Sequence, residues 1–135
     1  MRLSGTVSRS CATLLAPLAL SGCIAAAAGA GAGAGIYATT RGVESVVSAS
    51  VDATFAAAES AFEYFEIEQT SMKVESGGAE RELEGRSEAR AVDVRVKFEE
   101  QGSGTHIEVT ARKNLVEWDK DFAREVVAKI VEIAG

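Results

Sequence analysis

One segment of the chain alternates strictly between apolar and charged side chains. Its apolar members are Val92, Val94, Val96 and Phe98, and the charged ones between them are Asp93, Arg95 and Lys97. A period of two is the repeat of a β-strand, so the segment predicts a strand with one buried side and one solvent-facing side. Gly102-Ser103-Gly104 follows as a turn, and the alternation resumes over residues 105–111. The pattern predicts an antiparallel hairpin whose apolar side must be covered by another layer.

Two other segments carry apolar residues at helical spacing and can supply that layer. The stripe in residues 51–65 consists of Val51, Phe55, Ala58, Phe62 and Phe65, and the stripe in residues 119–134 consists of Phe122, Val126, Ile130 and Ala134. Ser50 is a suitable N-cap for the first helix. Such stripes favour two amphipathic helices that bury one side each against a sheet.

Residues 42–49, 66–75 and 80–88 predict three further strands. The third of these is dense in charge, with Leu83 as its one large aliphatic residue, which favours an edge position in the sheet. The order is therefore β-α-β-β-β-β-α. We expect an α+β domain over residues 37–135, in which two helices pack on one face of a mainly antiparallel sheet of four to five strands.

The N-terminal segment has the layout of a bacterial lipoprotein signal. Arg2 and Arg9 precede an apolar run at residues 11–20, which is too short to span a bilayer but suits a secretory signal peptide. Leu20, Ser21, Gly22 and Cys23 come next and resemble a lipobox, an aliphatic residue and two small ones before a cysteine. We therefore expect residues 1–22 to be a signal peptide and Cys23 to carry lipid.

Residues 23–36 are expected to form a lipidated N-terminus and a flexible tether rich in glycine and alanine. Two alternatives remain: a signal peptide with an incidental cysteine, and an uncleaved anchor in the uncharged stretch 11–38. Many lipoproteins that are retained in the inner membrane have Asp directly after the lipidated cysteine, where this chain has Ile24. By analogy with known lipoproteins, the absence of Asp implies a place on the periplasmic face of the outer membrane.

The charge balance disfavours several partners. Removal of Arg2 and Arg9 leaves twelve basic and twenty acidic side chains, a net charge of −8. Nucleic acid is disfavoured because its binding depends on phosphate neutralisation. The acidic balance also disfavours docking on anionic lipid through a basic surface. Cys11 lies in the segment expected to be removed, so Cys23 is the single cysteine of the mature chain and its lipid leaves no free thiol.

No motif for catalysis, a cofactor or a metal is evident. The glycine-rich stretch 29–35 lacks the Lys-Ser/Thr of a phosphate loop. His106 is the one histidine and alternates onto the solvent side of its strand, and zinc would need several such ligands. The acidic residues of the segment 80–88 lack the spacing of a calcium loop. Arg81, Arg86 and Arg90 are interleaved with these acids, and we expect them to pair across the sheet. We also expect a protein that is not an enzyme.

The segment GIYATTRGVESVVSASVDATFAAAESAFEYFEI and the hairpin VDVRVKFEEQGSGTHIEV, behind a lipobox and a Gly/Ala tether, resemble a family of small bacterial lipoproteins. That family is known only as a domain of unknown function. The resemblance covers residues 34–134 and departs from the family at Arg112–Trp118, where a glycine-bearing turn and Gly-Asp are expected. It implies no activity, and no catalytic residue carries over.

Two functions are consistent with these features. The first is a non-enzymatic envelope lipoprotein that acts as a structural module or contacts another envelope protein. The second is a carrier of a small ligand or lipid, with a cavity between helices and sheet lined by Phe55, Phe62, Phe65 and Phe98.

Lipid attachment makes a direct prediction. Cells that express the Cys23→Ser variant should incorporate no labelled fatty acid into this protein, whereas the wild-type chain should be labelled, because the thiol is the acceptor. The measurement is autoradiography or click detection of the immunoprecipitated chain. Equal labelling of the two proteins would refute the anchor.

Overall fold

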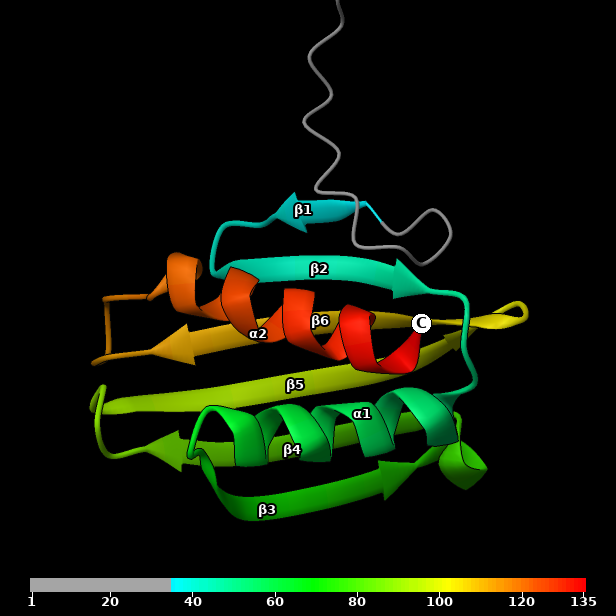
Figure 1. Ribbon diagram of the computed structural model, residues 1–135, viewed down its shortest axis with the longest axis horizontal. Coiled ribbons are helices and arrows are strands. Elements are labelled where there is room, and N and C mark those ends of the chain that lie inside the picture. The colour runs from blue at the N-terminus through cyan, green and yellow to red at the C-terminus, as the bar shows by residue number, and fades with distance from the viewer. Residues whose placement is uncertain (1–34) are drawn as a thin grey trace, which may run out of the picture.

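The computed structural model describes residues 35–135 (Figure 1). The strands are β1 (Ile36–Ala38), β2 (Gly42–Val47), β3 (Glu68–Glu75), β4 (Glu80–Ser87), β5 (Val92–Gln101) and β6 (Gly104–Arg112). The helices are α1 (Val51–Tyr64) and α2 (Lys120–Ala134), and a short 3-10 turn, η1 (Ser76–Gly78), joins β3 to β4. Both helices lie side by side on one face of the sheet, which confirms the two-layer α+β class (Figure 1).

The sheet has six strands in the order β1-β2-β6-β5-β4-β3, and every neighbouring pair is antiparallel. The expectation of four to five strands was therefore too low. The extra strand is β1, whose three residues are too few to show an alternation. The expected edge position of residues 80–88 was also wrong, because β4 lies between β3 and β5. Three of the four outward charges of β4 pair with an opposite charge on a neighbouring strand: Glu82 with Lys73, Glu84 with Arg95 and Arg86 with Asp93. This pairing makes an inner position acceptable.

The predicted hairpin is confirmed as β5 and β6. Val96 pairs with Val109 and Phe98 with Ile107, and all four side chains are almost fully buried beneath the helices. Because side chains on a strand alternate between faces, this register also places Asp93, Arg95, Lys97 and Glu99 of β5 on the opposite face. The hairpin thus separates an apolar layer from a charged surface.

Both helices begin at side-chain caps. The Ser50 hydroxyl accepts a hydrogen bond from the amide of Ala53 at 3.2 Å, and the Asp119 carboxylate accepts one from the amide of Phe122 at 3.0 Å. Each cap satisfies an amide that has no partner inside its helix. The predicted stripes are buried in the core, except that Phe65 and Ala134 at the helix ends are only partly buried.

Aromatic contacts join the helices to the sheet and to each other. The rings of Phe55 on α1 and Phe98 on β5 are 5.2 Å apart, and those of Phe65 and Phe122 are 5.5 Å apart. Ring pairs at these separations add about 0.5–1.5 kcal/mol beyond the area they bury. The space between the two layers is therefore filled by side chains at these points. None of the helices within residues 35–135 is long and apolar enough to cross a membrane.

A paired position in β3 and β4 offers a test of this packing. Leu83 is fully buried, whereas its register partner Met72 on the edge strand is 53% exposed. Leu83→Ala should lower the free energy of unfolding by about 2–5 kcal/mol, because it removes packed methyl groups and leaves a cavity. Met72→Ala should change it by less than about 0.5 kcal/mol. Urea unfolding followed by Trp118 fluorescence measures the free energy of unfolding of both variants. Equal losses would contradict the burial of Leu83 beneath the helices and the exposure of Met72 at the sheet edge.

Candidate functional site

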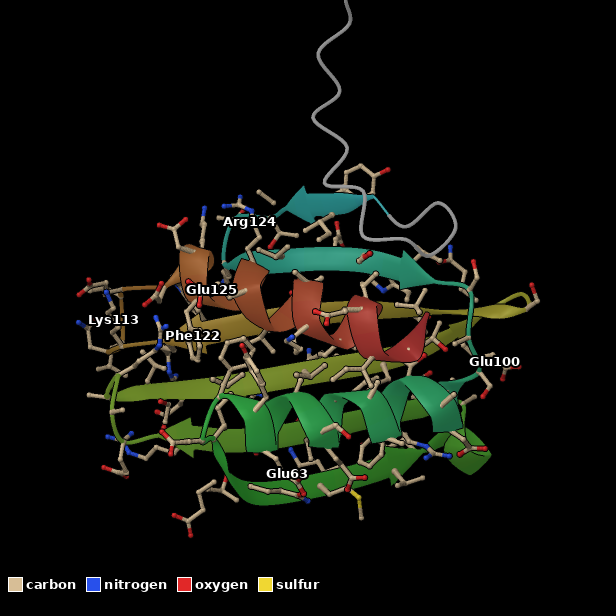
Figure 2. All side chains as sticks on the ribbon, in the orientation of Figure 1. Glu63, Glu100, Lys113, Phe122, Arg124 and Glu125 are labelled. Atoms are coloured by element: carbon tan, nitrogen blue, oxygen red, sulfur yellow. The ribbon has the colours of Figure 1, made fainter. Side chains whose placement is uncertain are left out.

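Cys23 and the other lipobox residues, Leu20, Ser21 and Gly22, lie outside the described residues, so the structure does not place them. The described domain offers a different candidate surface. Within residues 35–135 the sheet has no second layer on the face away from the helices, and we call this the open face (Figure 1). Its outward residues from β3 to β6 are mostly charged. Figure 2 draws the side chains of the described domain from the helix side, with Arg124 and Glu125 of α2 labelled.

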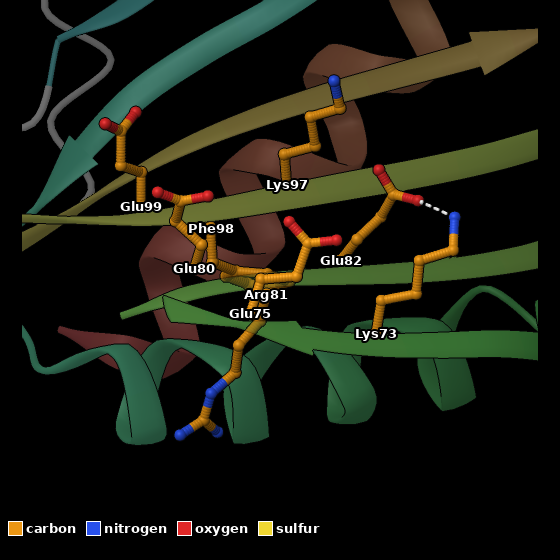
Figure 3. A pocket seen from close by; sticks show the side chains of 8 residues that line it. All are labelled: Lys73, Glu75, Glu80, Arg81, Glu82, Lys97, Phe98 and Glu99. Atoms are coloured by element: carbon orange, nitrogen blue, oxygen red, sulfur yellow. Dashed lines mark hydrogen bonds and ion pairs between the residues drawn. The ribbon is translucent and has the colours of Figure 1, made fainter. Parts of the chain in front are cut away.

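Figure 3 shows a hollow of about 330 Å³ on the open face across β3, β4 and β5. Two rows of charged side chains cross the sheet at this hollow. Each of the three strands contributes one side chain to each row. The first row contains Lys73, Glu82 and Lys97, and the second contains Glu75, Glu80 and Glu99. The rows arise because residues that pair in register on neighbouring strands project from the same face of the sheet.

Two residues of the first row, Lys73 and Glu82, belong to an ion-pair network. Lys73 Nζ donates to Glu82 Oε1 at 2.9 Å, drawn dashed in Figure 3, and Arg95 Nε donates to Glu84 Oε1 at 2.7 Å. The hydrogen bond from Lys73 lowers the pKa of Glu82, and the charge of Arg95 adds to the effect. The same bond raises the pKa of Lys73, while the bond to Glu84 raises the pKa of Arg95. These ion pairs hold the charges in defined positions across three strands.

The second row is a run of three carboxylates. Glu75, Glu80 and Glu99 lie on adjacent strands, and none of them forms an ion pair within residues 35–135. Across the part of the chain that the structure describes, no group of three or more His, Cys, Asp or Glu residues is placed to hold a metal ion. The row therefore gives this end of the open face a negative charge without forming a coordination site.

Of Arg81, Arg86 and Arg90, which were expected to pair across the sheet, only Arg86 does so. Arg86 Nη1 donates to Asp93 on β5 at 2.8 Å. Arg81 points to the helix layer, where it pairs with Asp52 and its guanidinium carbon lies 5.4 Å from the centre of the Phe55 ring. Arg90 lies in the turn before β5, 4.1 Å from the centre of the Phe122 ring, and donates to Glu125 on α2 at 3.2 Å. These last two arginines fasten the helices to the sheet.

His106 lies on the open face, as the alternation predicts, but it is half-buried rather than fully solvated. Its Nε2 is 3.0 Å from Glu44 Oε2 on the neighbouring strand β2. A general base needs a substrate group or nucleophile within hydrogen-bond reach. The contact of His106 is to a carboxylate on the neighbouring strand, so the pair links β2 to β6.

The turn between β6 and α2 carries a feature that the sequence analysis missed. Leu115 and Val116 are 88% and 86% exposed, the highest values among the large apolar residues of the described domain. The only sequence signal is a pair of aliphatic residues inside the charged stretch RKNLVEWDK. We call residues 113–117 the apical turn.

Hydrogen bonds fix the shape of the apical turn. The amide of Lys113 donates to the Glu117 carbonyl at 3.0 Å, and Arg112 forms an antiparallel bridge with Trp118. The Asn114 side-chain oxygen accepts from the amides of Val116 and Glu117, both at 3.0 Å. Two aliphatic side chains thus project from a closed turn.

Comparison with known proteins gives one family. The family described as "Protein of unknown function (DUF3568)" matches residues 6–130. Since the match covers most of the chain, the protein belongs to this family. No curated protein matches the chain. The family has no described activity, so the surfaces of the domain are the available guide to its function.

The Lys73–Glu82 pair predicts a specific acid sensitivity. A carboxyl group whose pKa is lowered by folding stabilises the folded state above its ordinary value of 4.5, and this contribution disappears as the pH falls through the lower folded value. Glu82→Gln should therefore lose less stability than the wild type between about pH 7 and about pH 3. The melting temperature at the two pH values measures this. Glu75→Gln, which removes a carboxylate without an ion pair among residues 35–135, is the control and should not reduce the loss.

Proposed function

We propose that the protein is a lipoprotein of the bacterial cell envelope, anchored through lipid on Cys23, that serves as a non-enzymatic structural or protein-interaction module. The sequence support is the lipobox at residues 20–23, preceded by a basic and apolar signal and followed by the tether. The proposed location is the periplasmic face of the outer membrane, because the residue after Cys23 is Ile24 and not the Asp typical of lipoproteins retained in the inner membrane.

The observation that carries the interaction role is the open face. A two-layer domain leaves one sheet face in solvent, and here that face presents charges in a fixed pattern. Lys73, Glu82, Glu84 and Arg95 hold one another across three strands. Preorganised charges contribute to the choice and orientation of a partner more than to raw affinity. The face thus suits recognition of a second envelope protein with a complementary charge pattern.

The carrier alternative has no supporting observation in the described residues. The hollows described for the domain lie at its surface and are lined mainly by polar and charged side chains. Phe55, Phe62 and Phe98 are buried in the core, and Phe55 contacts Phe98 directly. They fill the space between the helices and the sheet in which a ligand would have to lie.

Affinity capture after crosslinking in intact cells tests the interaction role. The wild-type chain should recover a specific envelope protein, and Lys97→Glu on the open face should lower its recovery about tenfold or more, the effect of about 1.4 kcal/mol of charge repulsion. Lys97 is suitable because it is exposed and forms no ion pair within residues 35–135.

Arg124→Glu on the exposed side of α2 is the matched control, since it reverses one charge in the helix layer. Recovery should be unchanged by this variant. Absence of any specific partner with the wild type would count against the interaction role. Equal recovery with Lys97→Glu would show that the open face is not the interface.

A further inference from the structure

The charge around the apical turn differs from that of the domain as a whole. The mature chain is strongly acidic, yet Arg41, Arg112 and Lys120 are exposed beside the turn. Arg41 lies 5.9 Å from the centre of the Trp118 ring, which places it at the base of the turn. Arg41 and Lys120 form no ion pair within the described domain. This end of the molecule therefore presents cations with free charge.

The acids of the same region are already engaged. Lys113 Nζ lies 3.7 Å from Glu117 and 3.6 Å from Asp119. The Asp119 carboxylate also caps α2, and Glu117 accepts a hydrogen bond from the Asn114 side-chain amide at 3.1 Å. Lys113 offsets the charge of one of these two carboxylates. Arg112, which lies 4.0 Å from Asp93, and Arg41 and Lys120, which form no ion pair within the described domain, place three further positive charges beside the turn.

An aliphatic apex, a tryptophan just behind it and free cations around it match the layers of a phospholipid surface. Aliphatic side chains prefer the acyl region, tryptophan prefers the level of the headgroups, and arginine and lysine extend to the phosphates. Anionic headgroups attract cations close to the surface, and this attraction acts within a Debye length. A local basic region can therefore bind where the overall charge is unfavourable.

We propose that the apical turn inserts Leu115 and Val116 into the headgroup region of a phospholipid bilayer and gives the domain a second membrane contact besides the lipid on Cys23. The inference rests on the proposed function for the nearness of the bilayer. Its chemistry, however, is independent of acylation.

The tether is long enough for both contacts to reach one bilayer. Ile36 lies opposite Ser45 of β2, while Gly42 pairs with Thr110 of β6, so about eight residue steps separate the start of β1 from Leu115 along the strands. At about 3.3 Å per step this is about 26 Å. The twelve residues 24–35 span at most about 40 Å when extended.

A tethered contact can be weak and still be occupied. A short linker holds the second site at an effective concentration of about millimolar, so two aliphatic side chains suffice where a free domain would not bind. The apical turn lies at one end of the strands (Figure 1), so docking through it would direct the strands away from the bilayer. The open face would then remain free for a protein partner.

Trp118 is the single tryptophan of the chain and provides the test. The full chain, as cells process it, is reconstituted into vesicles of phosphatidylethanolamine with a minority of phosphatidylglycerol. Part of the lipid carries bromine on the upper acyl chain, which quenches a nearby indole. Trp118 fluorescence of the wild type should be quenched by the brominated vesicles and not by unbrominated ones.

The double variant Leu115→Ser with Val116→Ser should lose this quenching. Burial of each aliphatic side chain is worth about tenfold or more in an equilibrium constant, so the pair should weaken the contact about a hundredfold. Met72→Ser with Val74→Ser is the matched control, since these residues are also more than half exposed but lie on β3. Its quenching should equal that of the wild type, and circular dichroism verifies that each variant is folded.

Two results would overturn the proposal: a wild-type chain that is not quenched, which would leave the turn to a protein partner, and quenching that persists in the Leu115/Val116 variant. Acyl labelling of the same preparation reports on Cys23 alone. Labelled protein without quenching refutes the turn and retains the anchor. Unlabelled protein with quenching that depends on Leu115 and Val116 refutes the anchor and supports the turn.

Discussion

The contact between the apolar side of β4–β6 and the two helices is the interaction on which the rest of the structure depends. Leu83, Val96 and Val109 form a continuous buried floor, and α1 and α2 cover it with their apolar stripes. Neither layer could bury its apolar side without the other. Because strand side chains alternate, this burial also determines which residues face solvent. The charged open face is thus a consequence of the packing on the opposite side.

The packing of the helices on the sheet does not cover its two edge strands, which must be protected in other ways from pairing with a further strand. One edge is β1, only three residues long, and the other is β3, eight residues long. In β3 the register shifts between Gln69 and Ser71, and Lys73 projects from the strand. Irregular pairing and lysine both discourage association with a further strand. The bond from Lys73 to Glu82 also ties the edge strand to its inner neighbour.

The elements predictable from sequence are those whose pattern is repeated. The seven-residue alternation of β5 and the stripes of α1 and α2 extend over several turns or pleats, so their periods are unambiguous. β1 was missed because three residues carry no period. The position of β4 was misjudged because its charge was taken as a sign of an edge, whereas Glu82 and Glu84 are neutralised by Lys73 and Arg95. Pairing across strands depends on strand order, which no local pattern contains.

The candidate surfaces could likewise be predicted only where the sequence pattern repeats. The solvent side of β5 could be predicted, but the ion pairs that arrange its charges needed the register of three strands. The exposure of Leu115 and Val116 was hidden for a different reason. Two aliphatic residues beside charged ones are typical of a partly buried segment, and only the hydrogen bonds of Asn114 and Lys113 turn them outward. A turn of five residues has no periodicity to reveal which way its side chains point.

The arrangement of these features has a mechanical consequence. β1 and β6, which leads into the apical turn, lie on either side of β2. In the proposed arrangement, lipid on Cys23 and insertion of the apical turn would hold the domain at two separated points. Two such contacts would restrict rotation and tilt relative to the membrane, which a single lipid attachment would leave free. Loss of that freedom before a partner arrives lowers the entropic cost of binding. A charged face of modest affinity can then select its partner by orientation as much as by strength.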